Sequence, residues 1–203
     1  MPTSVALVVA WQFNRHLSSG CHLACRPPPC ASATTTVCRR LASERHPCMQ
    51  VACLWACRDA ANSSPNINYD FCVAELLPYP GSRSADQKSL TVIAATLAKD
   101  KTTSASAKVK SLLARTSDPK TKQCLESCGS VYEDLLSDLN TSIPAIKEGR
   151  LVDAKTYLSA AVDEPDTCED GFKELKVPSP LTKEDSDLTQ MCTIALAFTN
   201  MLG

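Results

Sequence analysis

The sequence predicts an all-α protein: an up-down-up-down bundle of four helices that follows a short helical hairpin and is stapled by disulfides. Three observations support this prediction. Aromatic residues are only 5% of the chain and glycines number six, whereas alanine, leucine, lysine and glutamate dominate the second half, as helices favour. Apolar residues recur every three or four positions in segments separated by proline or glycine. Twelve cysteines in 203 residues include pairs whose spacing suits cross-links between helices.

A helical pattern covers residues 128–172, which we interpret as two helices folded back on each other. Apolar or small residues recur with helical spacing on both sides of Gly149, and the break at this glycine lets the two runs lie antiparallel. Cys128 lies near the start of the first run and Cys168 near the end of the second. Because those two ends meet in an antiparallel pair, we expect a Cys128–Cys168 disulfide.

Two more long helices complete the predicted bundle. One begins at Ser84, and its polar middle, residues 99–106, predicts looser packing; its apolar stripe is Leu90, Ile93, Leu97, Ala105, Val109 and Leu112. The other follows an N-cap at Thr182. Pro144 and Pro165 fall late in the helices on either side of Gly149, where a proline predicts a kink or early fraying.

A second disulfide is expected in the short hairpin that precedes the bundle. Cys57 and Cys72 flank a Ser-Ser-Pro-Asn turn, a spacing that suits a local bond between two short helices. So many cysteines indicate either metal binding or, in a secreted protein, disulfides. Candidate glycosylation sites at Asn62 and Asn140 favour secretion. No segment approaches the roughly 20 apolar residues of a membrane-spanning helix.

Residues 1–52 differ in composition from the rest of the chain. Residues 1–56 hold all three histidines and five arginines against one glutamate, a net charge of +4; because the whole chain is −1, the remainder carries −5. A zinc site would need a second cysteine pair or histidines in register with the first pair, which this segment lacks. The apolar run at residues 5–11 has no preceding basic residue and makes no convincing signal peptide. We expect 1–52 to be disordered, leader-like or a misassigned start, and 53–203 to form the domain.

The sequence argues against catalysis and against binding to nucleic acid or membranes. A mildly acidic body offers no basic face to either polyanion. No histidine follows His46, so a Ser-His or Cys-His pair cannot form in the domain. Nucleotide-binding, hydrolase and zinc-protease motifs are missing from the sequence. We expect no enzyme activity, no catalytic residues, no cofactor and no metal, and a protein that works through its surface.

Five stretches are more specific than a generic bundle: SPNINYDFC at 64–72, AAV at 160–162, TCEDGF at 167–172, SPLT at 179–182 and IALA at 194–197. Through them, residues 53–203 resemble the plant invertase and pectin methylesterase inhibitors. The spacing of Cys57 and Cys72 is similar to that of the invertase inhibitor subgroup that includes the plane pollen allergens.

The resemblance implies a helical hairpin beside a four-helix bundle, with the disulfides Cys57–Cys72 and Cys128–Cys168. Cys124 and Cys192 fall outside the family pattern, so they form either a third bridge or buried free thiols. The resemblance also implies a one-to-one complex that blocks the active-site cleft of pectin methylesterase or acid invertase, in the apoplast or the vacuole. The chain lacks the Pro-Lys-Phe tripeptide that many invertase inhibitors carry, so both targets stay open.

The partner-binding surface is expected on the polar outer faces of the bundle. The residues predicted for it are Asp134, Asp138, Asp153 and Lys155. The alternative function is that of a non-inhibitory structural or ligand-carrying, allergen-like helical protein, which would require an apolar cavity.

Overall fold

The computed structural model describes residues 52–203, which form six α-helices and, within that range, no strand. Their bounds are α3 Ala52–Ser63, α4 Tyr69–Leu76, α5 Gln87–Leu113, α6 Pro119–Glu148, α7 Leu151–Leu175 and α8 Thr182–Asn200. None of these helices is both long enough and apolar enough to cross a membrane. The predictions for the N-terminal leader-like segment fall on residues 1–51, outside the described part of the chain.

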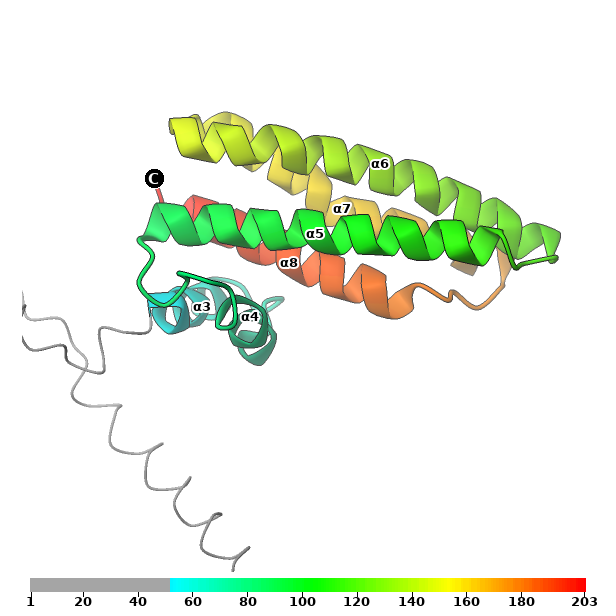
Figure 1. Cartoon of the computed structure of the whole chain (residues 1–203), viewed down its shortest axis with the longest axis horizontal. Coiled ribbons are helices and arrows are strands. Elements are labelled where there is room, and N and C mark those ends of the chain that lie inside the picture. The colour runs from blue at the N-terminus through cyan, green and yellow to red at the C-terminus, as the bar shows by residue number, and fades with distance from the viewer. Residues whose placement is uncertain (1–51) are drawn as a thin grey trace, which may run out of the picture. The chain divides into compact units, whose positions relative to one another are not determined.

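The four long helices form an antiparallel bundle, with α3 and α4 packed beside one end of it (Figure 1). Each long helix packs against the next one in the chain, and α8 closes the ring by packing against α5. Short connections force this up-down order, because a few residues cannot carry the chain back along a helix of 25 residues or more. The predicted all-α architecture is confirmed.

The α3–α4 hairpin is held internally by the Cys57–Cys72 disulfide. Asn68 caps α4, since its side chain accepts a hydrogen bond from the backbone N–H of Phe71 at 3.0 Å. Gln190 of α8 ties the hairpin to the bundle: it accepts from the N–H of Asn68 at 3.0 Å and donates to the carbonyl of Asn66 at 2.7 Å.

Helices α6 and α7 are joined by the buried Cys128–Cys168 disulfide, whose Cα atoms lie 4.8 Å apart. The two cysteines outside the family pattern, Cys124 and Cys192, are buried free thiols, so the third bridge is not formed. Burial raises the pKa of the Cys192 thiol to about 12 and also raises that of Cys124. Both thiols therefore stay protonated and pack as small apolar groups.

The starts of α5 and α8 differ from the prediction. Asp86, rather than Ser84, starts α5, because its carboxylate accepts from the N–H of Ser89 at 2.7 Å. The same bond to Ser89 lowers the pKa of Asp86. Thr182 is the first residue of α8 rather than its cap, and its hydroxyl donates to Glu169 of α7 instead.

The buried face of α5 consists of smaller residues than predicted. Ile93 and Leu97 are only half-buried, whereas the neighbouring alanines and Thr102 are fully buried. The Thr102 hydroxyl donates to the carbonyl of Ala98 at 2.8 Å, and this bond lets a polar side chain enter the core. Thr102 and Ala105 are the two buried residues of the segment 99–106, for which looser packing stays a prediction.

Neither internal proline ends its helix. Helix α6 continues beyond Pro144 to Glu148, and α7 continues beyond the buried Pro165 to Leu175, so neither helix frays early, and a kink at either proline stays a prediction. Helix α6 ends instead at Gly149, in the left-handed conformation at φ 78° that glycine tolerates best.

Candidate partner-binding surface on helices α6 and α7

The Cys128–Cys168 bond sets the register of the surface formed by α6 and α7. Because the helices are antiparallel, each step forward along α6 from this bond is matched by a step back along α7. The level of Asp134 on α6 is therefore that of Val162 on α7. This register brings α6 carboxylates next to those that follow Val162.

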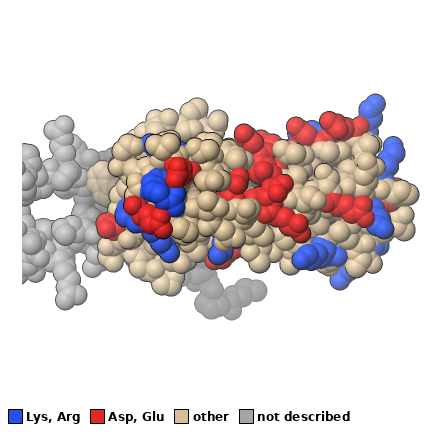
Figure 2. Space-filling view, turned by 90° about the horizontal axis from the view of Figure 1, so that it is seen from above, with Lys and Arg blue, Asp and Glu red and all other residues tan. Residues whose placement is uncertain are grey.

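Four carboxylates meet there: Asp134 and Asp138 from α6, Asp163 and Glu164 from α7. Partial burial, followed by the charges of the other three, raises the pKa of Glu164. Burial and the charge of Asp134 raise the pKa of Asp138. None of the four takes part in an ion pair found among residues 52–203. Figure 2, which looks down on these helices, shows acidic side chains gathered in a band across the middle of the molecule.

An acidic cluster without cations attracts a positively charged partner and rejects a negatively charged one. The neighbouring charges raise the pKa of Glu164 and of Asp138, so a basic group from a partner would relieve a repulsion that already exists in the free protein. We call Asp134, Asp138, Asp163 and Glu164 the acidic cluster.

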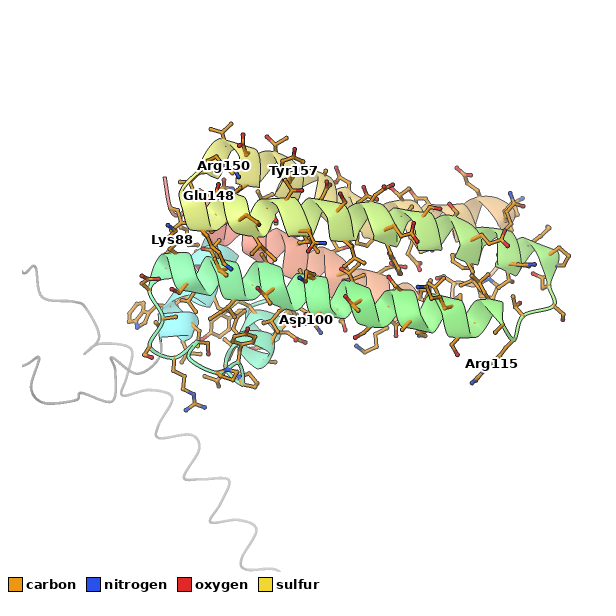
Figure 3. The ribbon with its side chains drawn as sticks, turned by 45° about the horizontal axis from the view of Figure 1, so that its top comes forward. Lys88, Asp100, Arg115, Glu148, Arg150 and Tyr157 are labelled. Carbon is orange, nitrogen blue, oxygen red and sulfur yellow. A yellow bond between two sulfur atoms is a disulfide. The ribbon has the colours of Figure 1, made fainter. Side chains whose placement is uncertain are left out.

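An exposed aromatic residue extends this surface along α7. Tyr157 is 37% exposed and lies seven residues before Glu164, which is about two helical turns and therefore the same face of α7 (Figure 3). Val152, on the same helix, is 79% exposed. Tyrosine provides much contact area at a small cost in conformational entropy, and it is common at the centre of protein interfaces.

The other two residues predicted for partner binding lie elsewhere. Asp153 lies in the first turn of α7, about 15 Å from Asp163 along the helix, and it pairs with Arg150. Lys155 donates to the carbonyl of Gly203 at 2.6 Å. The structure therefore brings Asp134 and Asp138 together, but it engages Asp153 and Lys155 in contacts at the end of the bundle near the chain terminus.

Comparison with known proteins gives this surface its context. The family model described as plant invertase/pectin methylesterase inhibitor matches residues 53–198. The chain belongs to this inhibitor family. A protein of Platanus orientalis named "Putative invertase inhibitor" is 41% identical over 148 residues, which are 72% of this chain and 87% of the relative. A pectinesterase inhibitor of Actinidia deliciosa is 31% identical over 136 residues, 66% of this chain and 74% of the relative.

Solved structures agree on the fold. A crystal structure of a pectin methylesterase inhibitor from Arabidopsis thaliana matches with a TM-score of 0.56 and 24% identity, over 70% of this chain and 93% of that chain. At this identity the match shows the architecture of the inhibitor family and nothing about which enzyme is bound.

Three candidate contact residues were not predicted from the sequence: Asp163, Glu164 and Tyr157. A signal was available for the two acids, because the Cys128–Cys168 bond already fixes which levels of α6 and α7 meet. Tyr157 had no such signal, because its helical spacing also fits a core position and only the packing leaves it exposed.

The two predicted glycosylation sites are both exposed, and a glycan at either site would not cover the acidic cluster. Asn62 lies near the end of α3, in the hairpin. Asn140 lies two residues after Asp138, a rotation of about 200° that turns it to the opposite flank of α6. A glycan at Asn140 would therefore cover the flank of α6 next to α5.

A groove of about 270 Å³ lies between α5 and α8 and is the alternative candidate for a ligand site. Charged side chains dominate its lining, which consists of Lys101, Ser104, Ala105, Lys108, Glu184, Asp187 and Leu188. Within residues 52–203 there is also no group of three or more histidine, cysteine or acidic side chains arranged to hold a metal. The acidic cluster with Tyr157 remains the best-formed candidate site.

Proposed function

We propose that the chain is a secreted proteinaceous inhibitor that binds a plant cell-wall carbohydrate enzyme, pectin methylesterase or acid invertase, and blocks its active-site cleft. The observation that carries the proposal is the family match over residues 53–198. The absence of any histidine after His46 supports a role in binding rather than in acid–base catalysis.

The contact surface in this proposal is the acidic cluster together with Tyr157. The aromatic ring supplies an anchor, and the carboxylates select a partner with basic groups around its cleft. A one-to-one complex of standard size would bury about 800 Å² on each partner.

Two disulfides and two exposed sequons support secretion to the apoplast. Disulfides persist in oxidising compartments, and the chain-entropy relation gives roughly 3 kcal/mol for the 57–72 loop and roughly 4 kcal/mol for the 128–168 loop. Such staples maintain a binding surface among extracellular proteases.

The alternative of a ligand-carrying protein receives less support. A carrier of apolar ligands needs an enclosed apolar cavity, whereas the groove between α5 and α8 has four charged residues in its lining, Lys101, Lys108, Glu184 and Asp187.

The proposal is tested by titrating the full chain against purified pectin methylesterase and purified acid invertase at pH 5. We expect stoichiometric loss of activity of one of the two enzymes at submicromolar to micromolar protein. Relatives of this chain carry both names, so the titration also assigns the target. Full activity of both enzymes at micromolar protein would overturn the proposal.

Charge reversal locates the surface. The double variant Asp134→Lys, Asp138→Lys should weaken inhibition by about tenfold or more, because it replaces attraction by repulsion. Asp100→Lys is the matched control, since Asp100 is an exposed carboxylate on α5 (Figure 3). Equal inhibition by the two variants would place the contact surface elsewhere on the bundle.

A further inference from the structure

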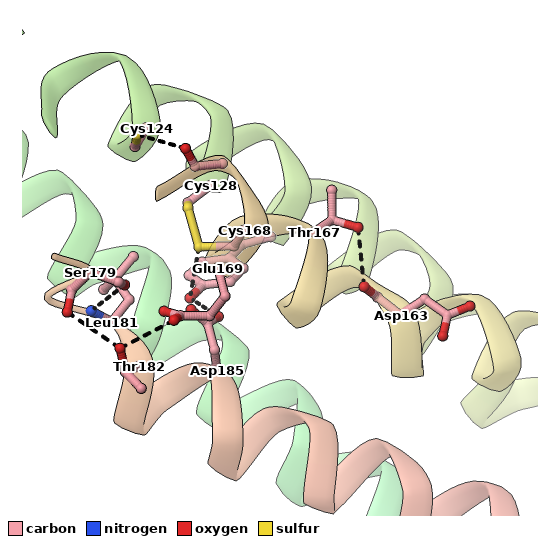
Figure 4. The surroundings of a disulfide bond; sticks show 12 residues. Cys124, Cys128, Asp163, Thr167, Cys168, Glu169, Ser179, Leu181, Thr182 and Asp185 are labelled. Carbon is pink, nitrogen blue, oxygen red and sulfur yellow. Dashed lines mark hydrogen bonds between the residues drawn. A yellow bond between two sulfur atoms is a disulfide. The ribbon is translucent and has the colours of Figure 1, made fainter. Parts of the chain in front are cut away.

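A polar cluster lies inside the bundle, where α6, α7 and α8 meet beside the Cys128–Cys168 disulfide (Figure 4). Asp185 of α8 is only 2% exposed and Tyr132 of α6 is fully buried. The Tyr132 hydroxyl donates to Asp185 Oδ1 at 2.5 Å and lies 3.9 Å from Cys168 Sγ.

A second carboxyl group, that of Glu169 on α7, belongs to the same cluster (Figure 4), and it raises the pKa of Asp185. One Glu169 oxygen, Oε2, accepts from the Thr182 hydroxyl at 3.2 Å. The remaining oxygen of each group, Asp185 Oδ2 and Glu169 Oε1, is buried and has no donor. The cluster therefore contains two buried acceptor oxygens, one from each carboxyl group, and neither has a donor.

Other charged groups near Asp185 do not resolve this conflict. Glu184, its neighbour on α8, adds negative charge, and it pairs with Lys108 of α5 at 2.8 Å. Lys108 also donates to the carbonyl of Pro180, so this cation is already engaged. A buried donorless carboxylate oxygen costs about 1–3 kcal/mol or more, and two adjacent buried anions repel each other strongly.

A single proton satisfies both oxygens. We infer that Asp185 and Glu169 share one proton in the folded protein, and that this proton is a pH-sensitive link between α7 and α8. A protonated Asp185 donates to Glu169 while still accepting from Tyr132, so Asp185 Oδ2 and Glu169 Oε1 both gain a partner.

The ionisation of the cluster agrees with this geometry. Burial and the hydrogen bond with Glu169 raise the pKa of Asp185 to about 8, although the bond from Tyr132 acts in the opposite direction. Burial, followed by the bond to Asp185, raises the pKa of Tyr132 as well, so the phenol remains a donor.

The direction of the pH effect follows from linkage. In the unfolded chain Asp185 ionises near its ordinary value of 3.8, whereas in the folded chain it keeps its proton up to about pH 8. Between those values the folded state binds one proton more than the unfolded state, so stability falls as pH rises. The link is complete at acidic pH and is lost above pH 8.

The test is the melting temperature of the full chain from pH 4 to pH 9, for the wild type and for Asp185→Asn. Asparagine accepts from Tyr132 and donates to Glu169 at every pH, so it imitates the protonated aspartate. We expect the variant to match the wild type within about 2 °C at pH 4.5 and to exceed it at pH 8.5. Asp187→Asn, on the same helix, is the control that should keep the wild-type slope. Parallel curves for the wild type and Asp185→Asn would overturn the inference.

A second measurement follows the ionisation of Asp185 directly, first in the wild-type protein and then in one variant. The carboxyl carbon of Asp185 is followed by nuclear magnetic resonance in labelled wild-type protein, and its titration midpoint should lie well above 3.8. Glu169→Gln supplies an amide donor to Asp185 Oδ2. In this variant the titration midpoint of the Asp185 carboxyl group should fall by about one pH unit or more. A wild-type midpoint near 4 would contradict the shared proton.

Discussion

At the scale of single residues, the acidic cluster lowers the stability of the fold, because its like charges repel one another. Asp134 and Asp138 are one turn apart on α6, and like charges at this spacing destabilise a helix by about 0.2–0.5 kcal/mol. Asp163 and Glu164 add to the repulsion from α7. A surface that costs stability is expected where binding, rather than folding, requires it.

Asp138→Asn should therefore stabilise the protein by about 0.2–0.5 kcal/mol at pH 7. The raised pKa of Asp138 means that the folded state favours the neutral carboxyl, so the wild type loses stability as pH rises through that pKa. The gain should vanish at pH 3, where aspartate is already protonated. Urea unfolding at both pH values measures it.

The control for this substitution is Glu126→Gln on the same helix. Glu126 lies 3.9 Å from Lys122, so its charge is favourable and its removal should not stabilise the protein. A stabilisation of equal size in both variants would mean that loss of negative charge in general, rather than the cluster, is responsible.

Residue roles could be predicted from the sequence only where spacing constrains them. The pairs Cys57–Cys72 and Cys128–Cys168 follow from the positions of the helices, and the structure contains both bonds. Asp185 lies in the first turn of α8, where an acidic residue complements the helix dipole and would ordinarily be exposed. It lies three residues before Leu188, on the apolar stripe of α8, so its burial follows from the same periodicity once the helix is in place.

At the scale of helices, the presence of each helix could be predicted from the sequence, whereas its first and last residues could be predicted less well. Periodicity over many residues identifies a helix, whereas its start depends on which of several polar side chains caps it. Ser84 and Asp86 compete for that role before α5, and the carboxylate that reaches an N–H at 2.7 Å prevails.

Two glycines provide a matched test at this scale. Gly149→Ala should destabilise by about 1 kcal/mol, because alanine disfavours the left-handed conformation at φ 78°. Gly171→Ala should stabilise by about 0.5–1 kcal/mol, since Gly171 lies inside α7 and an added Cβ meets nothing within 4 Å. Chemical denaturation of both variants measures the two shifts, and the same sign for both would contradict this account of the α6–α7 turn.

At the scale of the whole molecule, the bundle was predictable because short loops leave few ways to arrange four helices. The residues of the contact surface could not be predicted, because they depend on which flank of each helix turns outward. Tyr157 shows this limit: its spacing fits a core position, and only the assembled bundle leaves it 37% exposed.

The Cys128–Cys168 bond and the turn at Gly149 also give the chain a closed covalent ring, with the bond at one end and the turn at the other. Cleavage after Arg150, in that turn, opens the ring without dividing the molecule. Cleavage after Arg115, in the loop between α5 and α6, lies outside the ring (Figure 3). No disulfide of the described chain crosses the Arg115 loop.

An arginine-specific protease therefore distinguishes the two ends of the bundle on a denaturing gel. Fragments cut at Arg150 should migrate together until a reductant is added, whereas fragments cut at Arg115 should separate without it. Separation of the Arg150 fragments without reductant would mean that the ring is open. The closed ring therefore protects the surface against proteolysis: a single cleavage at the exposed turn leaves α6 and α7 covalently joined.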